Sequence, residues 1–437
     1  MEKLAAPRGT ADLYPPESAR WQALESRIHA IARRFGYGEI RTPTFEATEL
    51  FRRGVGEATD VVEKEMYTFT DRSGRSLTLR PEFTAPVVRA LLEHHLLAQG
   101  PQRLYYVGPF YRYERPQKGR LREPHQFGVE CFGYADPEAD VEVMHIAAEL
   151  LRAYAVEATL ELNSIGDAQC RPRYREALLG HFGPHRNALS EDSQRRLDRN
   201  PLRLLDSKAP EDQALIETAP HFESMLCDAC AEHFARVRTL LDATGLRYRV
   251  NPRVVRGFDY YTRTVFEFVS SALGSQNSVC GGGRYDDLVA TLGGPATPGV
   301  GFGLGIERFL MVVDASGKEP VQRTGGIAAI ALGEAARTQV FPLVSTLRRI
   351  SDGIPVTMEY ADAKIGAQFK RAERTGARAA LIVGEDEVAE HRIALRDLER
   401  RVQTSLQQRE SLEATATEVL AWYRDLPESS QPDSRPV

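Results

Sequence analysis

The sequence predicts an α+β protein with a mostly antiparallel sheet domain, a helical insertion and a separate α/β domain. The stretches LYYVGPFYRYERP and HQFGVECFGY alternate with period two and predict two strands joined by a basic loop. Strand patterns stop between residues 171 and 245, where Leu- and Arg-rich stretches predict short helices. After residue 325, three apolar strand runs alternate with helical patterns, which is typical of an α/β domain.

The two alternating stretches carry polar side chains on one face of the predicted sheet. That face holds Phe110, Arg112, Glu114, Gln126, Gly128, Glu130 and Phe132. The loop between them, PQKGRLRE, can reach an anionic substrate with Lys118, Arg120 and Arg122. Charged side chains inside a sheet cost free energy unless they meet partners. The pattern therefore favours a polar binding pocket, and the alternative is an exposed hairpin with a solvated face.

Composition narrows the class of protein. A chain of 437 residues is too long for one core and indicates two or three domains. Its 42% hydrophobic and 27% charged content is typical of a soluble globular protein. No apolar run approaches the ~18 residues of a membrane span, and MEKLAAPRGTADLYPPE does not resemble an export signal. Five cysteines favour a cytoplasmic location, and a net charge of −5 argues against a general nucleic-acid coat but leaves local basic patches open.

The N-terminal region predicts a helix, an edge strand and a second helix. Apolar residues recur at spacings of three and four from Trp21 to Phe35, which indicates an amphipathic helix. EIRTPTFEATELF predicts a short edge strand, because Pro43 has no N–H to donate to a central sheet ladder. SLTLRPEFTAPVVRALLEHHL passes from alternation into a helix near Thr84, and the turn carries Arg80 and Glu82.

The segment PGVGFGLGIERFLMVV predicts a strand with a face of glycines, followed at once by a helix. Gly299, Gly301, Gly303 and Gly305 share that face, which would let a flat ligand lie against the backbone. An adenine ring on the glycines with phosphates near Arg308 is the expected arrangement. The alternative is a packed strand approached closely by another element. Neither a P-loop nor a dinucleotide-binding βαβ turn fits these glycines.

Taken together, these segments resemble the class II aminoacyl-tRNA synthetases, and the whole chain is similar to the histidyl-tRNA synthetases. EIRTPTFE resembles motif 1, the dimer element; GPFYRYERPQKGR with HQFGVE resembles motif 2; and GVGFGLGIERF resembles motif 3. RGFDYYTRTVFEF and GGGRYDDL resemble signatures of the histidyl subfamily. One departure is Phe83 in LRPEFTAP, where many relatives carry Gly, so the pocket wall beside Glu82 is expected to differ.

The resemblance implies ATP-dependent ligation of L-histidine to tRNA(His) through a histidyl-adenylate, by a homodimer. It places Arg112 and Arg256 at the α-phosphate of ATP and Arg308 at the γ-phosphate, where negative charge concentrates. Glu114 is expected near the adenine amino group. Mg²⁺ would arrive with ATP, and no dedicated metal site of the protein is expected.

Basic and polar residues of the motif 2 loop complete the implied nucleotide and tRNA contacts. The resemblance assigns Arg120 to ATP. It assigns Arg115 and Gln117 to the acceptor end of the tRNA.

The resemblance also implies a pocket for histidine. The residues assigned to it are Glu82, Thr84, Gln126, Glu130, Tyr261 and Tyr285. An imidazole has two distinct nitrogens, so the carboxylate of Glu130 and the hydroxyl of Tyr261 are the expected pair for it. The others would hold the α-amino group or close the pocket. The alternative for each tyrosine is sheet packing, and for Thr84 it is a helix cap.

The expected domain division follows the motifs. It gives residues 1–170 and 246–318 to the catalytic domain, 171–245 to the helical insertion, 325–425 to an anticodon-binding α/β domain and 426–437 to a flexible tail. Within the insertion, Cys227 and Cys230 form a CxxC, but no second pair or His-x₃₋₅-His follows at zinc spacing. We therefore interpret them as exposed helix cysteines.

Two other functions compete with histidine ligation. A synthetase-like regulatory subunit of ATP phosphoribosyltransferase would lack aminoacylation activity. Such paralogues typically lack the C-terminal domain and degrade the RGFDYYTRTVFEF signature, and this chain has both. A prolyl, threonyl or glycyl synthetase would share the C-terminal domain class, but GGGRYDDL and the pair Glu130 and Tyr261 oppose it.

Overall fold

The computed structural model describes residues 4–56, 59–114, 121–273, 277–317, 325–360 and 363–427. The chain divides into two compact units, Met1–Pro320 and Val321–Val437, each with its own sheet and core. Within the described residues, no helix is both long and apolar enough to span a membrane.

The first unit is built on an eight-stranded sheet in the order β1-β5-β6-β11-β10-β9-β7-β8. The strands are β1 (Gly38–Glu39), β5 (Gln102–Pro109), β6 (His125–Phe132), β7 (Thr159–Ser164), β8 (Tyr248–Val250), β9 (Thr262–Val269), β10 (Ser278–Arg284) and β11 (Gly299–Gly305). Only the outer pairs β1 with β5 and β7 with β8 run parallel among these strands. The mostly antiparallel α+β fold that the sequence predicts is confirmed.

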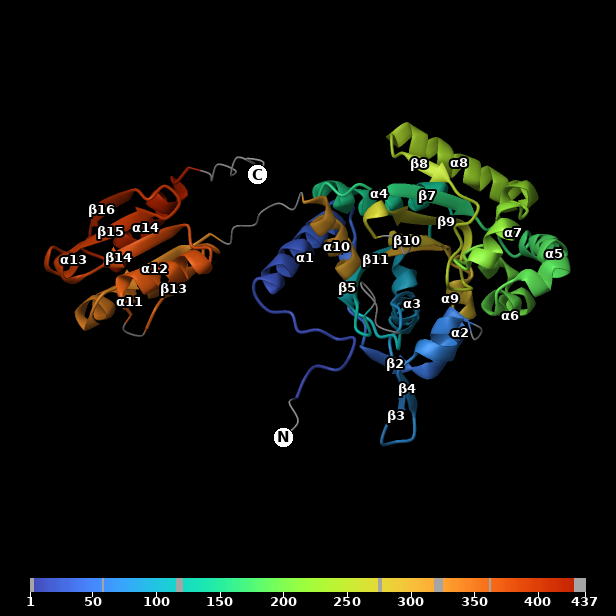
Figure 1. Ribbon diagram of the computed structural model, residues 1–437, viewed down its shortest axis with the longest axis horizontal. Helices are drawn as coiled ribbons and strands as arrows, with labels where there is room; N and C mark the ends of the chain where they lie inside the picture. The colour runs from blue at the N-terminus through green and yellow to red at the C-terminus, as the bar shows by residue number, and fades with distance from the viewer. Residues whose placement is uncertain are drawn as a thin grey trace. The chain divides into compact units, whose positions relative to one another are not determined.

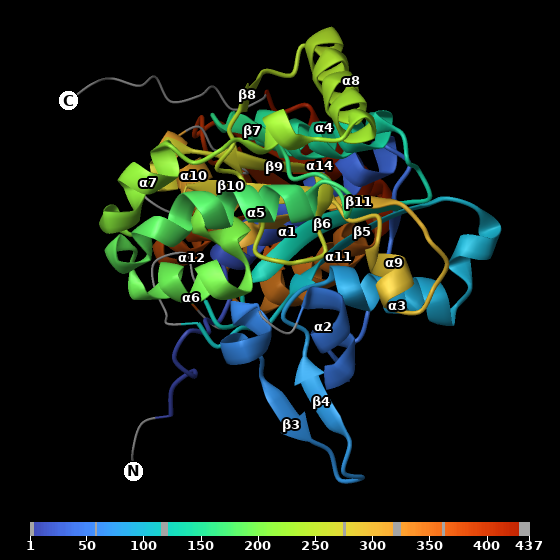
Figure 2. The same cartoon turned by 90° about the vertical axis from the view of Figure 1, so that its right-hand side faces the viewer.

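Ten α-helices accompany the sheet in the described part of this unit. They are α1 (Glu17–Arg34), α2 (Thr48–Val55), α3 (Thr84–Glu93), α4 (Pro137–Ala153), α5 (Arg171–Phe182), α6 (Glu191–Arg199), α7 (Gln213–Glu217), α8 (Asp228–Thr244), α9 (Leu288–Thr291) and α10 (Ile306–Ser316). The helices α5, α6 and α7 gather at one end of the sheet (Figure 1). A small sheet of β2 (Phe45–Ala47), β3 (Thr68–Thr70) and β4 (Ser76–Leu79) extends away from the large one (Figure 2).

Alternation along the strands divides the unit into two cores. Phe127 and Val129 of β6 face the core that α1, α4, α8 and α10 complete. The intervening residues of β6 face the opposite side, where Phe132 packs with α3 and the insertion helices. Because the polar residues Gln126 and Glu130 share this second side, the fold directs them toward α3 rather than toward the all-apolar core.

A buried ion pair joins the end of β10 to α4. The side chains of Arg284 and Asp140 are both fully buried and in direct contact. Arg284 also donates to the carbonyl oxygens of Tyr134 at 3.0 Å and Asp136 at 3.2 Å. Burial opposes ionisation of Asp140, but the charge of Arg284 outweighs it and lowers the pKa of the carboxyl. The pair therefore fixes the chain immediately before Tyr285.

One predicted strand is shorter than its pattern. β5 ends at Pro109, so Phe110, Arg112 and Glu114 lie beyond it and not within the strand. The backbone still pairs there, because the N–H of Phe110 donates to Pro124 at 2.9 Å and that of Arg112 to Arg122 at 3.0 Å. The reciprocal bonds are missing, because Pro124 has no N–H and the N–H of Arg122 donates to the carbonyl oxygen of Gly9 at 2.7 Å instead, which interrupts the ladder.

The second unit has a five-stranded sheet in the order β13-β12-β14-β15-β16. Its elements are β12 (Ile327–Ala331), α11 (Glu334–Ile350), β13 (Val356–Met358), α12 (Ile365–Arg374), β14 (Ala379–Val383), α13 (Glu385–Ala389), β15 (Arg392–Asp397), β16 (Gln403–Gln407) and α14 (Leu412–Arg424). The first three strands are parallel, as the alternating strand and helix patterns predict. The antiparallel strands β15 and β16 were not predicted, and β16 is a polar, mostly exposed strand without apolar alternation.

We expect the Asp140→Asn variant to be strongly destabilised, by about 3–5 kcal/mol, because the buried Arg284 guanidinium loses its fully buried counter-charge and keeps only the partly exposed Asp286 at 3.1 Å. Thermal or denaturant unfolding of the full chain measures this. Asp314→Asn is the control, since Asp314 pairs with Arg20 but its side chain is 58% exposed.

The destabilisation caused by Asp140→Asn should be smaller in acid than at neutral pH. The pKa of Asp140 is lowered in the folded chain, so its stabilising contribution is present above the ordinary carboxyl pKa. That contribution is lost as the pH falls toward the lowered value. The difference between wild type and Asp140→Asn should therefore narrow in acid, and a constant difference would contradict the assignment.

Candidate functional site

A cavity of about 330 Å³ opens on the polar side of the large sheet. The predicted site residues that line it are Glu82, Thr84, Arg112, Glu114, Gln126, Glu130, Arg256, Tyr261, Tyr285 and Arg308. They come from six separate stretches of sequence, which the sheet and α3 bring together. Arg115, Gln117 and Arg120 lie outside the described residues.

The carboxylate of Glu130 lies at the floor of the cavity, surrounded by hydroxyl groups. Its side chain accepts hydrogen bonds from Thr84 at 2.8 Å, from Tyr106 at 3.4 Å and from the hydroxyl of Tyr285. Burial raises the pKa of Glu130 to about 8, although the donors from Tyr285 and Thr84 oppose the shift. The floor of the cavity is therefore a buried, hydrogen-bonded carboxyl group that can exchange a proton near neutral pH.

Glu82 lies at the start of α3 and holds the first turn of that helix. Its carboxylate accepts from the backbone N–H of Thr84 at 2.7 Å and of Ala85 at 2.9 Å. Burial raises its pKa to about 6, and these backbone donors oppose the shift. Capping thus falls to Glu82 and not to Thr84, whose hydroxyl is directed to Glu130 instead. The sequence pattern alone could not show which of the two residues caps the helix and which bonds to Glu130.

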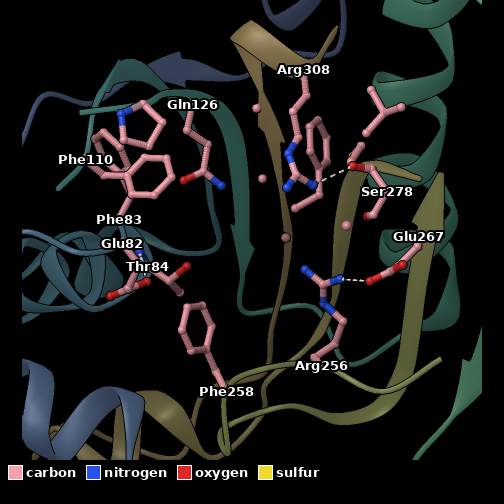
Figure 3. Close-up of a pocket in the computed structure, with 18 of the residues that line it drawn as sticks. Glu82, Phe83, Thr84, Phe110, Gln126, Arg256, Phe258, Glu267, Ser278 and Arg308 are labelled. Atoms are coloured by element: carbon pink, nitrogen blue, oxygen red, sulfur yellow. Dashed lines mark hydrogen bonds and ion pairs between the residues drawn. The ribbon is translucent and has the colours of Figure 1, made fainter. Parts of the chain in front are cut away.

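Three arginines supply positive charge to the cavity wall. Figure 3 shows Arg256 and Arg308 directed into the cavity from the side opposite Glu82, Thr84 and Gln126. Arg256 pairs with the carboxylate of Glu267, and Arg308 donates to the carbonyl oxygen of Ser278 at 3.1 Å.

The third arginine, Arg112, is held by the turn before α3. Its Nε donates to the carbonyl oxygen of Pro81 at 2.9 Å, and its guanidinium lies 4.0 Å from Glu114. For Arg256, burial disfavours the charged form, but the attraction of Glu267 outweighs burial and raises the pKa of Arg256 above its ordinary value. These cations are therefore permanent, as anion binding requires.

The glycine face of β11 is present, but neighbouring side chains cover part of it. A side chain at Gly301 would collide with the carboxylate of Glu130 and lie 2.6 Å from the hydroxyl of Tyr285. A side chain at Gly303 would overlap the amide of Gln126. The glycines thus make room for the polar residues of β6 first. Only the end near Gly305 stays open, where an added Cβ would lie 3.8 Å from the side chain of Arg308.

Several residues of the cavity were not predicted. Tyr106, Phe258, Tyr260 and Glu267 line it together with the predicted set. Glu267 is the clearest omission, because it pairs across the sheet with Gly281 and so receives Arg256 over a position without a side chain. A charged residue at an alternate position of TRTVFEF, opposite GGG, was the signal that could have identified it.

Phe83 fills the cavity wall beside Glu82. Its ring is stacked on that of Tyr106, with centroids 4.1 Å apart and planes 11° apart, and the guanidinium of Arg80 lies 4.2 Å from its centre. The departure at this position therefore adds an aromatic layer that holds Tyr106, a donor to Glu130.

The interpretation of Cys227 and Cys230 as exposed helix cysteines is wrong. Cys230 is fully buried, and Cys227 is only partly exposed. Both lie beside Asp167 and Cys170, and the four possible ligand atoms are within 4.8 Å of one another. The partners are distant in sequence, so a search for a second CxxC could not find them.

Comparison with known proteins matches most of the chain to one family. The family model for histidyl-tRNA synthetase matches residues 9–309, and the model for the anticodon-binding domain matches residues 328–421. The histidine–tRNA ligase of Streptococcus sanguinis is 46% identical over 91% of this chain and 94% of its own. That of Thermosynechococcus vestitus is 47% identical over 94% of this chain and 95% of its own.

A solved structure extends the likeness to three dimensions. The apo histidyl-tRNA synthetase of S. aureus superposes with a TM-score of 0.79 at 33% identity, covering 96% of this chain and all of the other. The matched regions include both compact units and every strand that lines the cavity. The chain therefore belongs to the histidyl-tRNA synthetase family of class II aminoacyl-tRNA synthetases.

Proposed function

We propose that this protein ligates L-histidine to tRNA(His) with ATP, through a histidyl-adenylate. The observation that carries the proposal is one cavity in which arginines line the wall and a buried carboxyl group with hydroxyl donors forms the floor. The first set suits a triphosphate and the second a small polar amino acid. Membership of the histidyl family supplies the identity of that amino acid.

The arginines account for the activation step. The histidine carboxylate attacks the α-phosphorus of ATP, a new P–O bond forms and pyrophosphate leaves. Arg112 and Arg256 hold the α-phosphate, where charge builds in the transition state, and Arg308 holds the γ-phosphate. Glu267 orients Arg256, and the carbonyl of Pro81 orients Arg112, so both cations are positioned before substrate binds.

Magnesium ions fit the cavity as partners of ATP. Mg²⁺ prefers oxygen ligands, and the carboxylates of Glu114 and Glu267 lie in the wall close to the arginines. When bound, Mg²⁺ neutralises charge on the phosphate oxygens. The adenine lies toward Gly305, with its amino group near Glu114.

Histidine is held at the floor of the cavity. Glu130 and Tyr261 bind the two imidazole nitrogens, and Glu82, Thr84 and Gln126 hold the α-ammonium group. Tyr285 closes the pocket and keeps Glu130 in place through its hydroxyl. An amino acid without a ring donor would forgo the hydrogen bond to the buried Glu130, which is how such a site rejects it.

The remaining parts of the chain serve the transfer to tRNA. Residues 325–425 read the anticodon, residues 171–245 form an insertion in the catalytic domain, and Arg115 and Gln117 approach the acceptor end. Two chains associate through the motif 1 region, and the enzyme acts in the cytoplasm. A regulatory subunit of ATP phosphoribosyltransferase is the less favoured function, because the anticodon-binding model matches residues 328–421 and the relatives are named histidine–tRNA ligases.

Arg256→Ala should reduce histidine-dependent ATP–pyrophosphate exchange by about 10²-fold or more, because it removes a preorganised cation at the α-phosphate. Arg253→Ala is the matched control, since Arg253 contacts Gln213 at 3.3 Å and does not line the cavity. Thermal unfolding of both variants separates catalysis from stability. Near-normal exchange in a folded Arg256→Ala enzyme would remove this residue from the mechanism.

Glu130→Gln should weaken histidine binding while ATP binding changes little, because the amide keeps the size but replaces an acceptor-only carboxylate. Calorimetry with each ligand measures this. Glu161→Gln is the control, because Glu161 is a buried strand carboxylate that pairs with Arg249 and Asn251 outside the cavity. Equal losses for both ligands would make Glu130 structural.

The same variant has a pH signature. The pKa of Glu130 is raised from 4.5 to about 8 in the folded chain, so folding stability falls as the pH rises between these values. Glutamine does not titrate. The stability of Glu130→Gln relative to wild type should therefore increase over this range.

A fragment of residues 1–320, the first compact unit, should retain pyrophosphate exchange and lose tRNA charging more severely, because it keeps the whole cavity and loses the anticodon domain. Analytical ultracentrifugation should show whether it still dimerises. A parallel fall of both activities would mean that the second unit only supports the dimer. Undiminished charging would exclude an anticodon-reading role for it.

A further inference from the structure

Four side chains with metal-binding chemistry meet where the insertion joins the sheet domain. Asp167, Cys170, Cys227 and Cys230 each offer one ligand atom, and these atoms lie within 4.8 Å of one another. Asp167 and Cys170 follow the end of β7, before α5 begins. Cys227 and Cys230 lie at the start of α8, with the insertion between the two pairs.

The spacing within each pair is the same. Asp167 and Cys170, like Cys227 and Cys230, are separated by two residues, and both segments form a helical turn. The carbonyl oxygen of Asp167 accepts from the N–H of Cys170 at 3.1 Å, and that of Cys227 accepts from Ala231 at 2.9 Å. Residues three apart in such a turn direct their side chains to the same side. Two short motifs, D-x₂-C and C-x₂-C, therefore converge on one point.

Contacts already join the two pairs. The Sγ of Cys170 accepts a hydrogen bond from the backbone N–H of Cys227 at 3.1 Å, across 57 positions of sequence. Cys170 is 2% exposed and Cys230 is fully buried, against the rings of Tyr174 and Phe222. Asp167 and Cys227 are partly exposed, which leaves a path from solvent. The cluster is enclosed on one side by apolar groups and accessible on the other, as structural metal sites require.

Hydrogen-bond donors and positive charge lie beside the cluster. The Sγ of Cys170 accepts from the backbone N–H of Cys227, the residue immediately before α8. A guanidinium nitrogen of Arg263 lies 3.7 Å from the carboxylate of Asp167. Three thiolates and one carboxylate around a divalent cation would leave net negative charge, and these groups offset it.

From this geometry we propose that Asp167, Cys170, Cys227 and Cys230 bind one structural Zn²⁺ ion. Zinc accepts thiolate and carboxylate ligands in a tetrahedron, whose ligand atoms are about 3.8 Å apart when the Zn–S distance is about 2.3 Å. The observed cluster needs only small movements to reach that separation. Thiolates exclude Mg²⁺ and Ca²⁺, which require oxygen ligands.

The ion closes the base of the insertion. It links the chain before α5 to the start of α8, and so ties the 57-position segment between Cys170 and Cys227 into a loop. The turn that carries Asp167 also contacts the chain near Tyr261. The N–H of Arg263 donates to the carbonyl oxygen of Gly166 at 2.7 Å, and Arg263 stands two positions after Tyr261. Zinc binding therefore stabilises the insertion and the segment just before β9 that carries Tyr261.

The test is the metal content of the full-length protein, produced with zinc in the medium and dialysed against metal-free buffer. Elemental analysis should find about one Zn²⁺ per chain. Cys170→Ser, Cys227→Ser and Cys230→Ser should each lose most of the zinc during dialysis, and Asp167→Asn should retain it more weakly. Cys131→Ser is the control, because Cys131 is a buried cysteine of β6 outside the cluster and should leave the zinc content unchanged.

Cobalt provides a second measurement on the unaltered chain. Co²⁺ replacing zinc should give the strong visible absorption of tetrahedral thiolate coordination, and zinc addition should remove it. Chelation should also speed proteolysis within residues 171–245. Both measurements use the unaltered chain, so they test the zinc site even where a cysteine variant fails to fold.

Three results would overturn the proposal. One is wild-type protein with negligible zinc and no thiolate absorption with Co²⁺. Another is zinc content that Cys227→Ser and Cys131→Ser reduce equally. The third is a disulfide within the cluster, found by mass spectrometry of protein prepared without reductant and unaffected by added zinc.

Discussion

The absence of side chains at two positions of β11 determines where the chemistry of this protein can lie. Gly301 leaves the space that the carboxylate of Glu130 and the hydroxyl of Tyr285 occupy, and Gly303 leaves the space of the Gln126 amide. Because β6 pairs with β11 residue by residue, a methyl group at either glycine would push these groups out of the cavity. The glycine face therefore shapes a polar pocket from neighbouring side chains, which is the pocket we propose for the amino acid.

The buried ion pair next to Tyr285 serves the same pocket. A fully buried Arg–Asp pair is rarely more stabilising than apolar packing. Its main effect here is therefore to hold the chain next to Tyr285 in one position. Arg284 is bonded to Asp140 and to carbonyl groups before α4. These bonds fix both the position and the orientation of the last residue of β10. Tyr285 follows directly and donates to Glu130. Loss of the pair should thus disturb the histidine site before it disturbs the rest of the sheet.

Local patterns predicted those features that depend on neighbours in sequence. Alternation in HQFGVECFGY was sufficient to put Glu130 and Gln126 on one face, and the glycine run was sufficient to place Arg308 at a strand-to-helix turn. The end of β5 at Pro109 depends on backbone bonds from distant segments, which no local pattern records. The meeting of Cys170 with Cys227 is equally non-local. Glu267 was missed because its role is defined by a partner, Arg256, that lies on another segment.

Two buried carboxyl groups in one small cavity explain why a cationic amino acid suits it. Burial raises the pKa of both Glu82 and Glu130, and the charge of Glu82 raises that of Glu130 further. An α-ammonium group beside Glu82 would offset one negative charge, which also makes ionisation of Glu130 less costly. The ionised Glu130 is then the better acceptor for an imidazole N–H. In the proposed binding mode, the two halves of the histidine molecule would therefore favour each other's binding through the electrostatics of the pocket, and a ring isostere without an N–H donor would forfeit the second contact.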